Sequence, residues 1–475
     1  MDRDLLPKYD KVVWISLDTL RADCIGFNKA KLFPREYKTK TKLKKNRLDW
    51  VCSKGFLFNN AISAAPYTSA SHAAYFTGLW PKNNGVYDQF NSKLKAETVF
   101  DMAKVAGFTT IFKTDFPFIL GKYLNMISSI DHYFIEDDEQ ALRELKKRKQ
   151  VFSFFHFGQI HYPYGFHNLT YGGKDYKKKV AELEKKYRIK TTRMNLDDMA
   201  IETFRKKKDL SLLYRYKKIV SFLYKNHLDD DLFDLYLEGI NYFHDKKFNR
   251  FLNTLLKILD GTNYLVIISS DHGEAWNDNT YGHHNSLDEG VIRVPVLFYA
   301  PNIKPKVYSN RIRTIDVVPT LNQVLFKNKR KFDGKSLDGI IYSGTVEKDR
   351  DAFSAVWVNE SKEVIKKIKQ LLGQGHISTN PRLSVKYSEA LYQGNIKFVK
   401  QHKKFMNRSE VLSDCLTSQA SKIGPLEKII ECRLTKKTQS EMITRIRKYN
   451  AIKVQKRMKK TENIRDYFNL LGYRI

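Results

Sequence analysis

The sequence predicts an α/β fold with a mostly parallel central sheet flanked by helices, followed by a smaller C-terminal subdomain. Short apolar runs rich in β-branched and aromatic residues recur along the 475 residues, and helical stretches separate several of them. Strands that alternate with helices are typical of parallel sheets covered on both faces. In such sheets the functional side chains lie on loops at the carboxyl ends of strands.

Five runs are predicted to be strands of this sheet. The first, Lys11–Leu17, is apolar and rich in β-formers, and it ends at Asp18, as expected for a buried parallel strand. The others are Thr109–Phe112, Gln150–Phe155, Asn263–Ser269 and Val294–Tyr299. The polar residues Asp18, His156, His161, Asp271 and His272 follow such runs closely. Their placement predicts a shared site at one edge of the sheet.

The chain is predicted to divide into residues 1–330 and residues 331–475. Residues 171–230 contain 17 Lys and Arg, 9 Asp and Glu and only two Gly, which predicts a helical basic insertion at about 172–230. Helical spacing then resumes from Leu232 to Leu255, which we expect to pack on the sheet. In the C-terminal region, Thr435–Lys460 is predicted to be a basic helix.

The net charge of +32 favours anionic partners. The basic runs fit either solvated helix faces or a docking surface for an anionic substrate or a membrane. Nucleic acid is not expected as the primary partner, because no motif that combines aromatic and basic side chains is present. With no signal peptide and no apolar run near the ~20 residues of a spanning helix, we expect a cytoplasmic protein, with peripheral membrane contact left open. The four Cys are expected to be ordinary thiols.

Four segments carry residues suited to chemistry. Asp18 ends the first strand, and Pro66–His72 places several hydroxyls before a predicted helix start, where free N–H groups favour an anion. Ser270–Glu274 follows another strand, and Tyr281–His284 contains two histidines. Asp and His side chains bind divalent metals, and a metal activates a hydroxyl at neutral pH. Each segment alone has a plain structural explanation, but together they favour a metal-assisted hydrolase.

The order of these segments resembles the sulfatase branch of the alkaline phosphatase superfamily. The similarity begins at Val12–Asp23, continues through Gly55–Ala61 into Pro66–Pro81, and includes Phe154–Tyr164. Later segments that resemble the family are Ser270–Glu274, Gly282–Pro295, Ile315–Leu321, Asp333–Leu337 and Leu471–Tyr473. The resemblance therefore spans nearly the whole chain. It implies an alkaline-phosphatase-like sandwich and a sulfatase-like catalytic domain in residues 1–330.

The resemblance implies a nucleophile at Thr68. In the family the nucleophile is the first residue of a Cys/Ser/Thr-x-Pro-Ser-Arg/His pentad, which reads Thr68-Ser69-Ala70-Ser71-His72 here. Thr cannot be converted to the formylglycine of typical sulfatases, so the pentad is more similar to that of phosphodiesterases, phosphonate hydrolases and phosphotransferases. Ser69 is the alternative nucleophile if the register is shifted.

The family pattern also implies a metal site at Asp18, Thr68, Asp271 and His272. This oxygen-rich set suits one divalent ion, Mn²⁺, Mg²⁺ or Ca²⁺, with Zn²⁺ as an alternative. His283 falls where phosphotransferase-like members carry a histidine and is expected to protonate the leaving group. The residues expected to bind the substrate are His72, His161, His284 and Lys113. His156 is expected to be a core histidine or one that supports the site from behind.

These assignments leave three functions open. The first is a metal-dependent hydrolase of phosphate esters on a glycan- or lipid-linked anionic substrate. The second is a sulfuric ester hydrolase that uses threonine, and the third is a phosphotransferase that modifies a surface polysaccharide or lipid. A non-catalytic binding protein would not need to keep the four metal-ligand positions intact.

Overall fold

The computed structural model describes most of the first 358 residues and parts of the remainder. The described ranges are 8–25, 37–88, 92–117, 119–162, 164, 169–190, 210–277, 280–283, 286–358, 385–402, 415–423, 429–431 and 436–449. Within these ranges, no helix combines the length and the apolar character needed to cross a bilayer.

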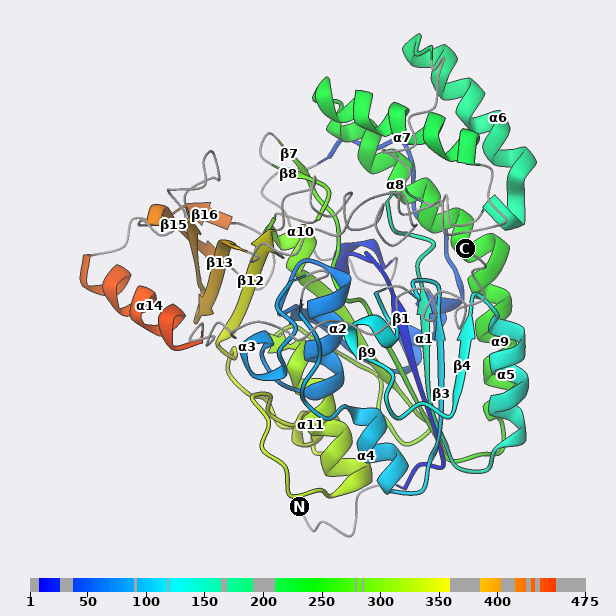
Figure 1. The fold of residues 1–475 in the computed structure, drawn as a ribbon, viewed down its shortest axis with the longest axis vertical. Helices are drawn as coiled ribbons and strands as arrows, with labels where there is room; N and C mark the ends of the chain where they lie inside the picture. Colours follow the sequence, from blue (N-terminus) through cyan, green and yellow to red (C-terminus); the bar gives the residue numbers. More distant parts are fainter. Residues whose placement is uncertain are drawn as a thin grey trace, which may run out of the picture.

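The main sheet is mixed and mostly parallel (Figure 1). Its order is β10-β2-β9-β6-β1-β5-β3-β4, with β11 also paired to β2. The strands are β1 (Lys11–Leu17), β2 (Phe56–Ile62), β3 (Thr109–Thr114), β4 (His132–Ile135), β5 (Val151–Phe157), β6 (Tyr264–Ser269), β9 (Arg293–Tyr299), β10 (Lys306–Tyr308) and β11 (Ile312–Arg313). All five predicted strands are present. The last of them, β9, runs antiparallel to both neighbours, β2 and β6.

Helices cover both faces of the sheet, which confirms the predicted fold class. On one face lie α1 (Arg47–Lys54), α5 (Asp138–Lys147) and α9 (Asn249–Leu259), and the core of this face continues into α8 (Asp229–Phe243), α7 (Leu210–Lys225) and α6 (Leu169–Tyr187), of which α7 packs on α8 and α6 on α7. On the other face lie α2 (Thr68–Thr77), α4 (Val99–Val105), α11 (Val317–Leu321) and α12 (Asp338–Tyr342). The described residues of the predicted basic insertion are thus largely helical, in α6 and α7.

Strand β1 shows why the sheet needs both layers. Val13, Ile15 and Leu17 pack into the core on the α8 and α9 side. Val12 and Trp14 pack into the core on the α2 side. Because successive strand side chains point to opposite faces, a continuous apolar run is buried on both faces only when helices cover each of them.

A second, antiparallel sheet lies beside the first, in the order β12-β13-β14-β15-β16. Its strands are β12 (Ala352–Val358), β13 (Val385–Gln393), β14 (Ile396–His402), β15 (Cys415–Ile423) and β16 (Ile429–Glu431), and α14 (Lys436–Tyr449) packs against it. In Figure 1 this unit projects from the side of the sandwich near α2 and α3 (Pro81–Asn84). The predicted basic helix matches α14 over its first part, and residues 450–460 lie outside the described ranges. The division at residue 330 stays a prediction.

Short elements complete the description of the fold. A hairpin of β7 (Trp276–Asn277) and β8 (Thr280–Tyr281) and the single-turn helix α10 (Glu289–Ile292) lie between β6 and β9. A π-helical turn, His244–Phe248, joins α8 to α9. Cys24 and Cys52 are buried and unpaired.

Candidate active site

Three elements bring the predicted metal ligands together. Asp18 follows β1, and Asp271 and His272 follow β6. Because β1 and β6 are adjacent and parallel, with Ser16 opposite Ser269, their carboxyl ends meet. Thr68 is the first residue of α2, whose N-terminus faces this edge. The sheet therefore places side chains that are 50 and more residues apart in the sequence within one cluster.

Helix α2 is held against the sheet by small and hydroxyl side chains. Every residue of α2 is buried, and Ala70 and Ala73 allow the helix to approach the sheet closely. Ser71 Oγ donates to the main-chain oxygen of Asp271 at 2.8 Å. Gly78, with φ of +66°, ends the helix in the left-handed region. These contacts fix the position of the Thr68 side chain relative to the strand ends.

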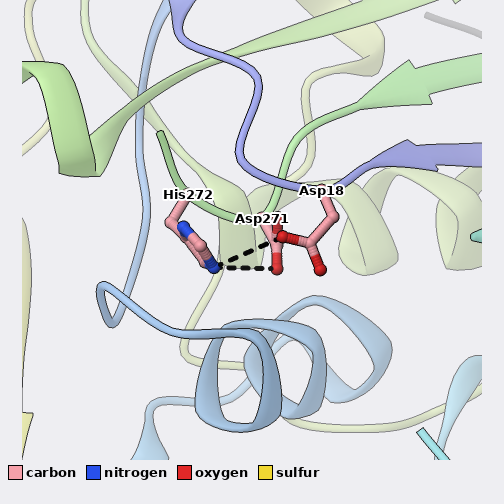
Figure 2. Close-up of side chains that lie close together, drawn as sticks. All are labelled: Asp18, Asp271 and His272. Atoms are coloured by element: carbon pink, nitrogen blue, oxygen red, sulfur yellow. Dashed lines mark ion pairs between the residues drawn. The ribbon is translucent and has the colours of Figure 1, made fainter. Parts of the chain in front are cut away.

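Asp18, Asp271 and His272 form a compact, fully buried group (Figure 2). One ligand atom from each lies within 4.8 Å of the others. His272 Nε2 lies 3.6 Å from Asp18 Oδ1 and 3.4 Å from Asp271 Oδ2. Two carboxylates and an imidazole at this spacing are a donor set for a divalent cation.

The hydrogen bonds of this group also fit a cation. His272 Nδ1 lies 3.0 Å from the oxygen of Gly273, which can only accept, so the proton is on Nδ1 and the Nε2 lone pair faces the carboxylates. Among the described residues Asp271 Oδ2 has no hydrogen-bond partner although it is buried. A lone pair and an unsatisfied carboxylate oxygen that face one another are unfavourable without a positive charge between them.

The pKa values of the two carboxyl groups move apart. Burial, followed by the negative charge of Asp18, raises the pKa of Asp271 well above its usual value. Burial acts in the same direction on Asp18, but a hydrogen bond from His156 and the charges of His161 and His272 outweigh it, so the pKa of Asp18 is lowered. Two carboxylates this close do not ionise together without a cation.

The Thr68 hydroxyl lies at the edge of the group. Its Oγ1 is 3.3 Å from Asp18 Oδ2, to which it donates, and 3.4 Å from His272 Nε2. The neighbouring Ser69 hydroxyl is turned elsewhere and donates to the main-chain oxygen of Asp88 at 3.0 Å. Of these two hydroxyls, the one at the predicted nucleophile position is the one that contacts the predicted metal ligands.

His72 lies beneath the site. Its Nδ1 donates to the oxygen of Thr68 at 2.8 Å, and its Nε2 is 2.9 Å from the Ser16 hydroxyl, which donates to it. Burial, then the neighbouring His156, lowers the pKa of His72 to about 3. The ring is therefore neutral at physiological pH and joins β1 to the first turn of α2. Contact between His72 and the substrate stays a prediction.

His161 and His283 lie beside the metal-ligand group. The His283 ring stacks on the His272 ring, with the ring centroids 4.1 Å apart. The half-buried His161 ring meets the His283 ring edge-on, with the ring centroids 4.9 Å apart. His283 Nδ1 lies 3.2 Å from both carboxylate oxygens of Glu274. The histidine predicted to protonate the leaving group is thus adjacent to the metal-ligand group.

Of the other two predicted substrate ligands, the structure describes only Lys113, which lies away from the metal-ligand group. Lys113 is in β3 and fully buried; its Nζ is 2.6 Å from Asp115 Oδ1, 2.6 Å from Asp138 Oδ1 and 2.8 Å from the oxygen of His156. The ammonium thus forms ion pairs with two carboxylates and a hydrogen bond to the main chain, and these contacts place Lys113 behind His156. His284 lies outside the described residues. Substrate contact by either residue is untested.

Thr19 and Glu274, to which no role was assigned from the sequence, also contact this site: Thr19 Oγ1 donates to Asp18 Oδ1 at 2.7 Å, and Glu274 contacts His283. His156, expected to be a core histidine or one that supports the site from behind, lies 2.9 Å from Asp18 Oδ2. Strand β5 extends two residues beyond its predicted end, so His156 is part of the strand and shares the face of Ser16, its register partner. The one sequence signal for Glu274 was its position two residues after His272.

Comparison with known proteins identifies the family. The sulfatase family model matches residues 10–325, more than half of the chain. The chain belongs to the sulfatase family. Among curated proteins, choline-sulfatase from Rhizobium meliloti (strain 1021) is 32% identical over 88 residues, which cover 18% of this chain and 17% of that relative. The aligned part is thus less than a fifth of the relative's length.

Solved structures show the same fold. Phosphonate monoester hydrolase of Agrobacterium radiobacter superposes with a TM-score of 0.54 at 14% identity and covers 82% of this chain and 87% of its own. A protein solved in complex with its substrate D-glucosamine-2-N,6-O-disulfate has a TM-score of 0.60 at 12% identity, over 95% and 100% of the two chains. The predicted alkaline-phosphatase-like sandwich of this sulfatase-family chain is confirmed.

Proposed function

We propose that this sulfatase-family chain is a metal-dependent hydrolase of phosphate esters in which Thr68 is the nucleophile. The observation that carries the proposal is the position of Thr68 Oγ1, which contacts both Asp18 and His272 at the N-terminus of α2. A hydroxyl held at a buried two-carboxylate, one-imidazole group is arranged for attack on an ester. Membership of a family of ester hydrolases supports the same reaction class.

Asp18, Asp271 and His272, with Thr68, would hold one divalent ion. When bound there, such an ion lowers the pKa of a hydroxyl and neutralises charge on an ester oxygen. Mn²⁺, Mg²⁺ and Ca²⁺ match the oxygen-rich set, and Zn²⁺ is the alternative.

Side chains of the protein carry out the other steps of the proposed reaction. The Thr68 hydroxyl points its hydrogen at Asp18 Oδ2, so an oxygen lone pair is available for in-line attack on phosphorus. As the bond from Thr68 Oγ1 to phosphorus forms, the hydroxyl proton goes to solvent water, the bond to the leaving alcohol breaks, and its electron pair goes to the alcohol oxygen, which His283 protonates. Water then attacks phosphorus as the bond to Thr68 Oγ1 breaks. The water gives its hydroxyl to phosphorus and a proton to His283, Thr68 Oγ1 recovers a proton from solvent, and inorganic or monoester phosphate leaves.

The substrate is proposed to be an anionic ester linked to a glycan or a lipid. The net charge of +32 would attract such a molecule. His161, His72, His284 and Lys113 remain the predicted contacts of its anionic oxygens; of these, His161 lies against both His272 and His283. Peripheral contact with an anionic membrane face and a cytoplasmic location remain part of this proposal.

A sulfuric ester is the second candidate substrate. The curated relative is a choline-sulfatase, and one structural neighbour was solved with a disulfated glucosamine. Sulfate and phosphate esters are both tetrahedral, and the same donor set would serve either of them. The pentad threonine is the feature that ranks phosphate first.

An activity panel tests the proposal. Aryl phosphate, phosphodiester, phosphonate and sulfate are each assayed with Mn²⁺, Mg²⁺, Ca²⁺ and Zn²⁺, on wild type, Thr68→Val and Ser69→Ala. Turnover of a phosphorus ester that disappears in Thr68→Val and persists in Ser69→Ala is the expected result. Turnover of sulfate alone would replace the substrate class. Turnover only after addition of an alcohol acceptor would replace hydrolysis by transfer, and loss in Ser69→Ala alone would move the nucleophile.

A further inference from the structure

The carboxylate of Glu274 lies on one edge of the His283 ring. Both of its oxygens are 3.2 Å from His283 Nδ1, and neither side chain is accessible to solvent beyond 2%. The two residues are nine positions apart, on either side of the β7–β8 hairpin.

The carboxylate is held from several sides. The Tyr164 hydroxyl hydrogen-bonds to it, and Trp276 Nε1 donates to that hydroxyl at 2.8 Å. Arg21 Nη1 donates to the main-chain oxygen of Glu274 at 2.9 Å. Gly282, with φ of +75°, lies so close that a Cβ there would be 3.3 Å from Glu274 Oε1. Such a network fixes the carboxylate in place before any substrate arrives.

The His283 ring is equally restricted. One face stacks on His272, and His161 meets the ring edge-on. When Nδ1 donates to the Glu274 carboxylate, its proton stays on the ring, and proton exchange with the substrate falls to the opposite nitrogen, Nε2. A carboxylate that fixes an imidazole in this way sets its tautomer and its orientation together.

We propose that Glu274 is the positioning residue for His283 and that it orients the ring so that Nε2 delivers the proton to the leaving alcohol. This inference rests on the proposed function. As the ester bond breaks, the leaving oxygen takes the bonding electron pair and the proton from His283 Nε2. The Nδ1 proton remains on the imidazole throughout, donated to Glu274, so no proton passes to the carboxylate. His283 regains its Nε2 proton from the water that later attacks the ester.

A leaving-group series separates this role from a merely structural one. Aryl and alkyl esters of the class that the panel identifies, from 4-nitrophenyl to a simple alkyl alcohol, are assayed with wild type, Glu274→Gln and His283→Gln. A well-stabilised leaving group needs no proton, whereas an alkoxide does. In Glu274→Gln we expect kcat for the alkyl ester to fall on the order of 100-fold, with 4-nitrophenyl turnover within about threefold of wild type and KM unchanged.

Glu289→Gln is the matched control. Glu289 is also a fully buried glutamate, but it contacts Lys397 and Tyr392 at the second sheet. It should leave the dependence on the leaving group unchanged. An equal loss on every ester in Glu274→Gln, or no loss at all, would overturn the inference.

The outcomes also separate this inference from the proposed function. If His283→Gln shows the leaving-group effect and Glu274→Gln does not, Glu274 is not the positioning residue although the reaction stands. If neither variant shows it while Thr68→Val is inactive, His283 does not protonate the leaving group, and the inference fails while the nucleophile stands.

A second measurement needs no Glu274 variant. In wild type labelled with ¹⁵N-histidine, with His283 assigned by comparison with His283→Gln, the nitrogen spectrum reports which ring nitrogen carries hydrogen. A protonated Nδ1 is expected. An Nδ1 without hydrogen would overturn the inference even if Glu274→Gln fails to fold.

Discussion

His156 donates from Nε2 to Asp18 Oδ2 across 2.9 Å, between adjacent parallel strands. The main-chain N–H of Asp115 points at His156 Nδ1 at 3.4 Å, so Nδ1 accepts and the ring proton is on Nε2. Both side chains are fully buried. A predicted metal ligand is thus oriented from behind by a histidine whose tautomer the backbone sets.

The first prediction concerns metal affinity. His156→Phe removes the donor to Asp18 and retains an aromatic ring, and we expect it to weaken binding of Mn²⁺ by about 10- to 100-fold. Titration calorimetry measures the affinity directly. His244→Phe is the control, because His244 is also buried but lies in the π-helical turn, where it packs against Phe243 and Phe248. Equal affinity in wild type and His156→Phe would mean that Asp18 is held without this histidine.

The second prediction concerns strain at Thr19. This β-branched residue has φ of +66°, which costs about 1–2 kcal/mol, while its hydroxyl donates to Asp18 Oδ1. Thr19→Gly should therefore keep or raise the free energy of unfolding and lower metal affinity. Denaturant unfolding and metal titration on the same variant test both parts. Lys327→Gly is the control, because Lys327 also has a positive φ, of +53°, but is far from Thr19 in the sequence. This variant should be more stable than wild type and should bind metal with the same affinity. A Thr19→Gly protein that is less stable yet binds metal normally would contradict the argument.

The third prediction concerns the buried Lys113. Lys113→Met leaves Asp115 without its closest cation and removes one of the two lysines that pair with Asp138, and we expect a loss of about 3–5 kcal/mol in the free energy of unfolding. Lys104→Met breaks a surface pair with Asp131 and should cost under about 1 kcal/mol. Urea unfolding of both variants gives the comparison. If Lys113→Met were as stable as wild type and impaired only in KM, substrate binding would be the better account of this lysine.

The fourth prediction concerns acid stability. Burial raises the pKa of Glu289, but Lys397 at 2.8 Å and Arg293 outweigh it, so the folded pKa lies below its ordinary value. Its contribution to stability is therefore present above the unfolded pKa of about 4.3 and is lost as the pH falls through the folded pKa. Glu289→Gln should flatten the decline in unfolding free energy below about pH 5, measured by urea titration at several pH values. Glu139→Gln, on the surface, should retain the wild-type decline. A steeper decline in Glu289→Gln would show that the pair does not stabilise the fold.

Local patterns predicted the sheet because a strand buried on both faces must be apolar throughout. Lys11–Leu17 was predicted with the bounds that the structure has. Helix α2 begins at Thr68, inside the hydroxyl-rich segment that was expected to precede it. The residues of β9 did not predict the direction of this strand. Whether β9 runs parallel or antiparallel to β6 depends on the path of the chain between the two strands.

The ligand positions Asp18, Thr68, Asp271 and His272 were named from the order of their motifs, and the structure brings them together. The contacts of Lys113 could not be read in the same way. It was predicted as a substrate ligand, and it lies among Asp115, Asp138 and His156 because β3 and β5 are neighbours and α5 covers them.

The sequence by itself determined the residue types at the strand ends, the covering helices and therefore the fold class of this protein. Only the tertiary structure decided which atoms of the residues at the strand ends form hydrogen bonds with one another. His156 faces Asp18, and Glu274 faces His283, because strand register and a hairpin carry them there. Periodicity is set by neighbours a few residues apart, whereas a contact of about 3 Å between distant residues is set by the packing of the whole core.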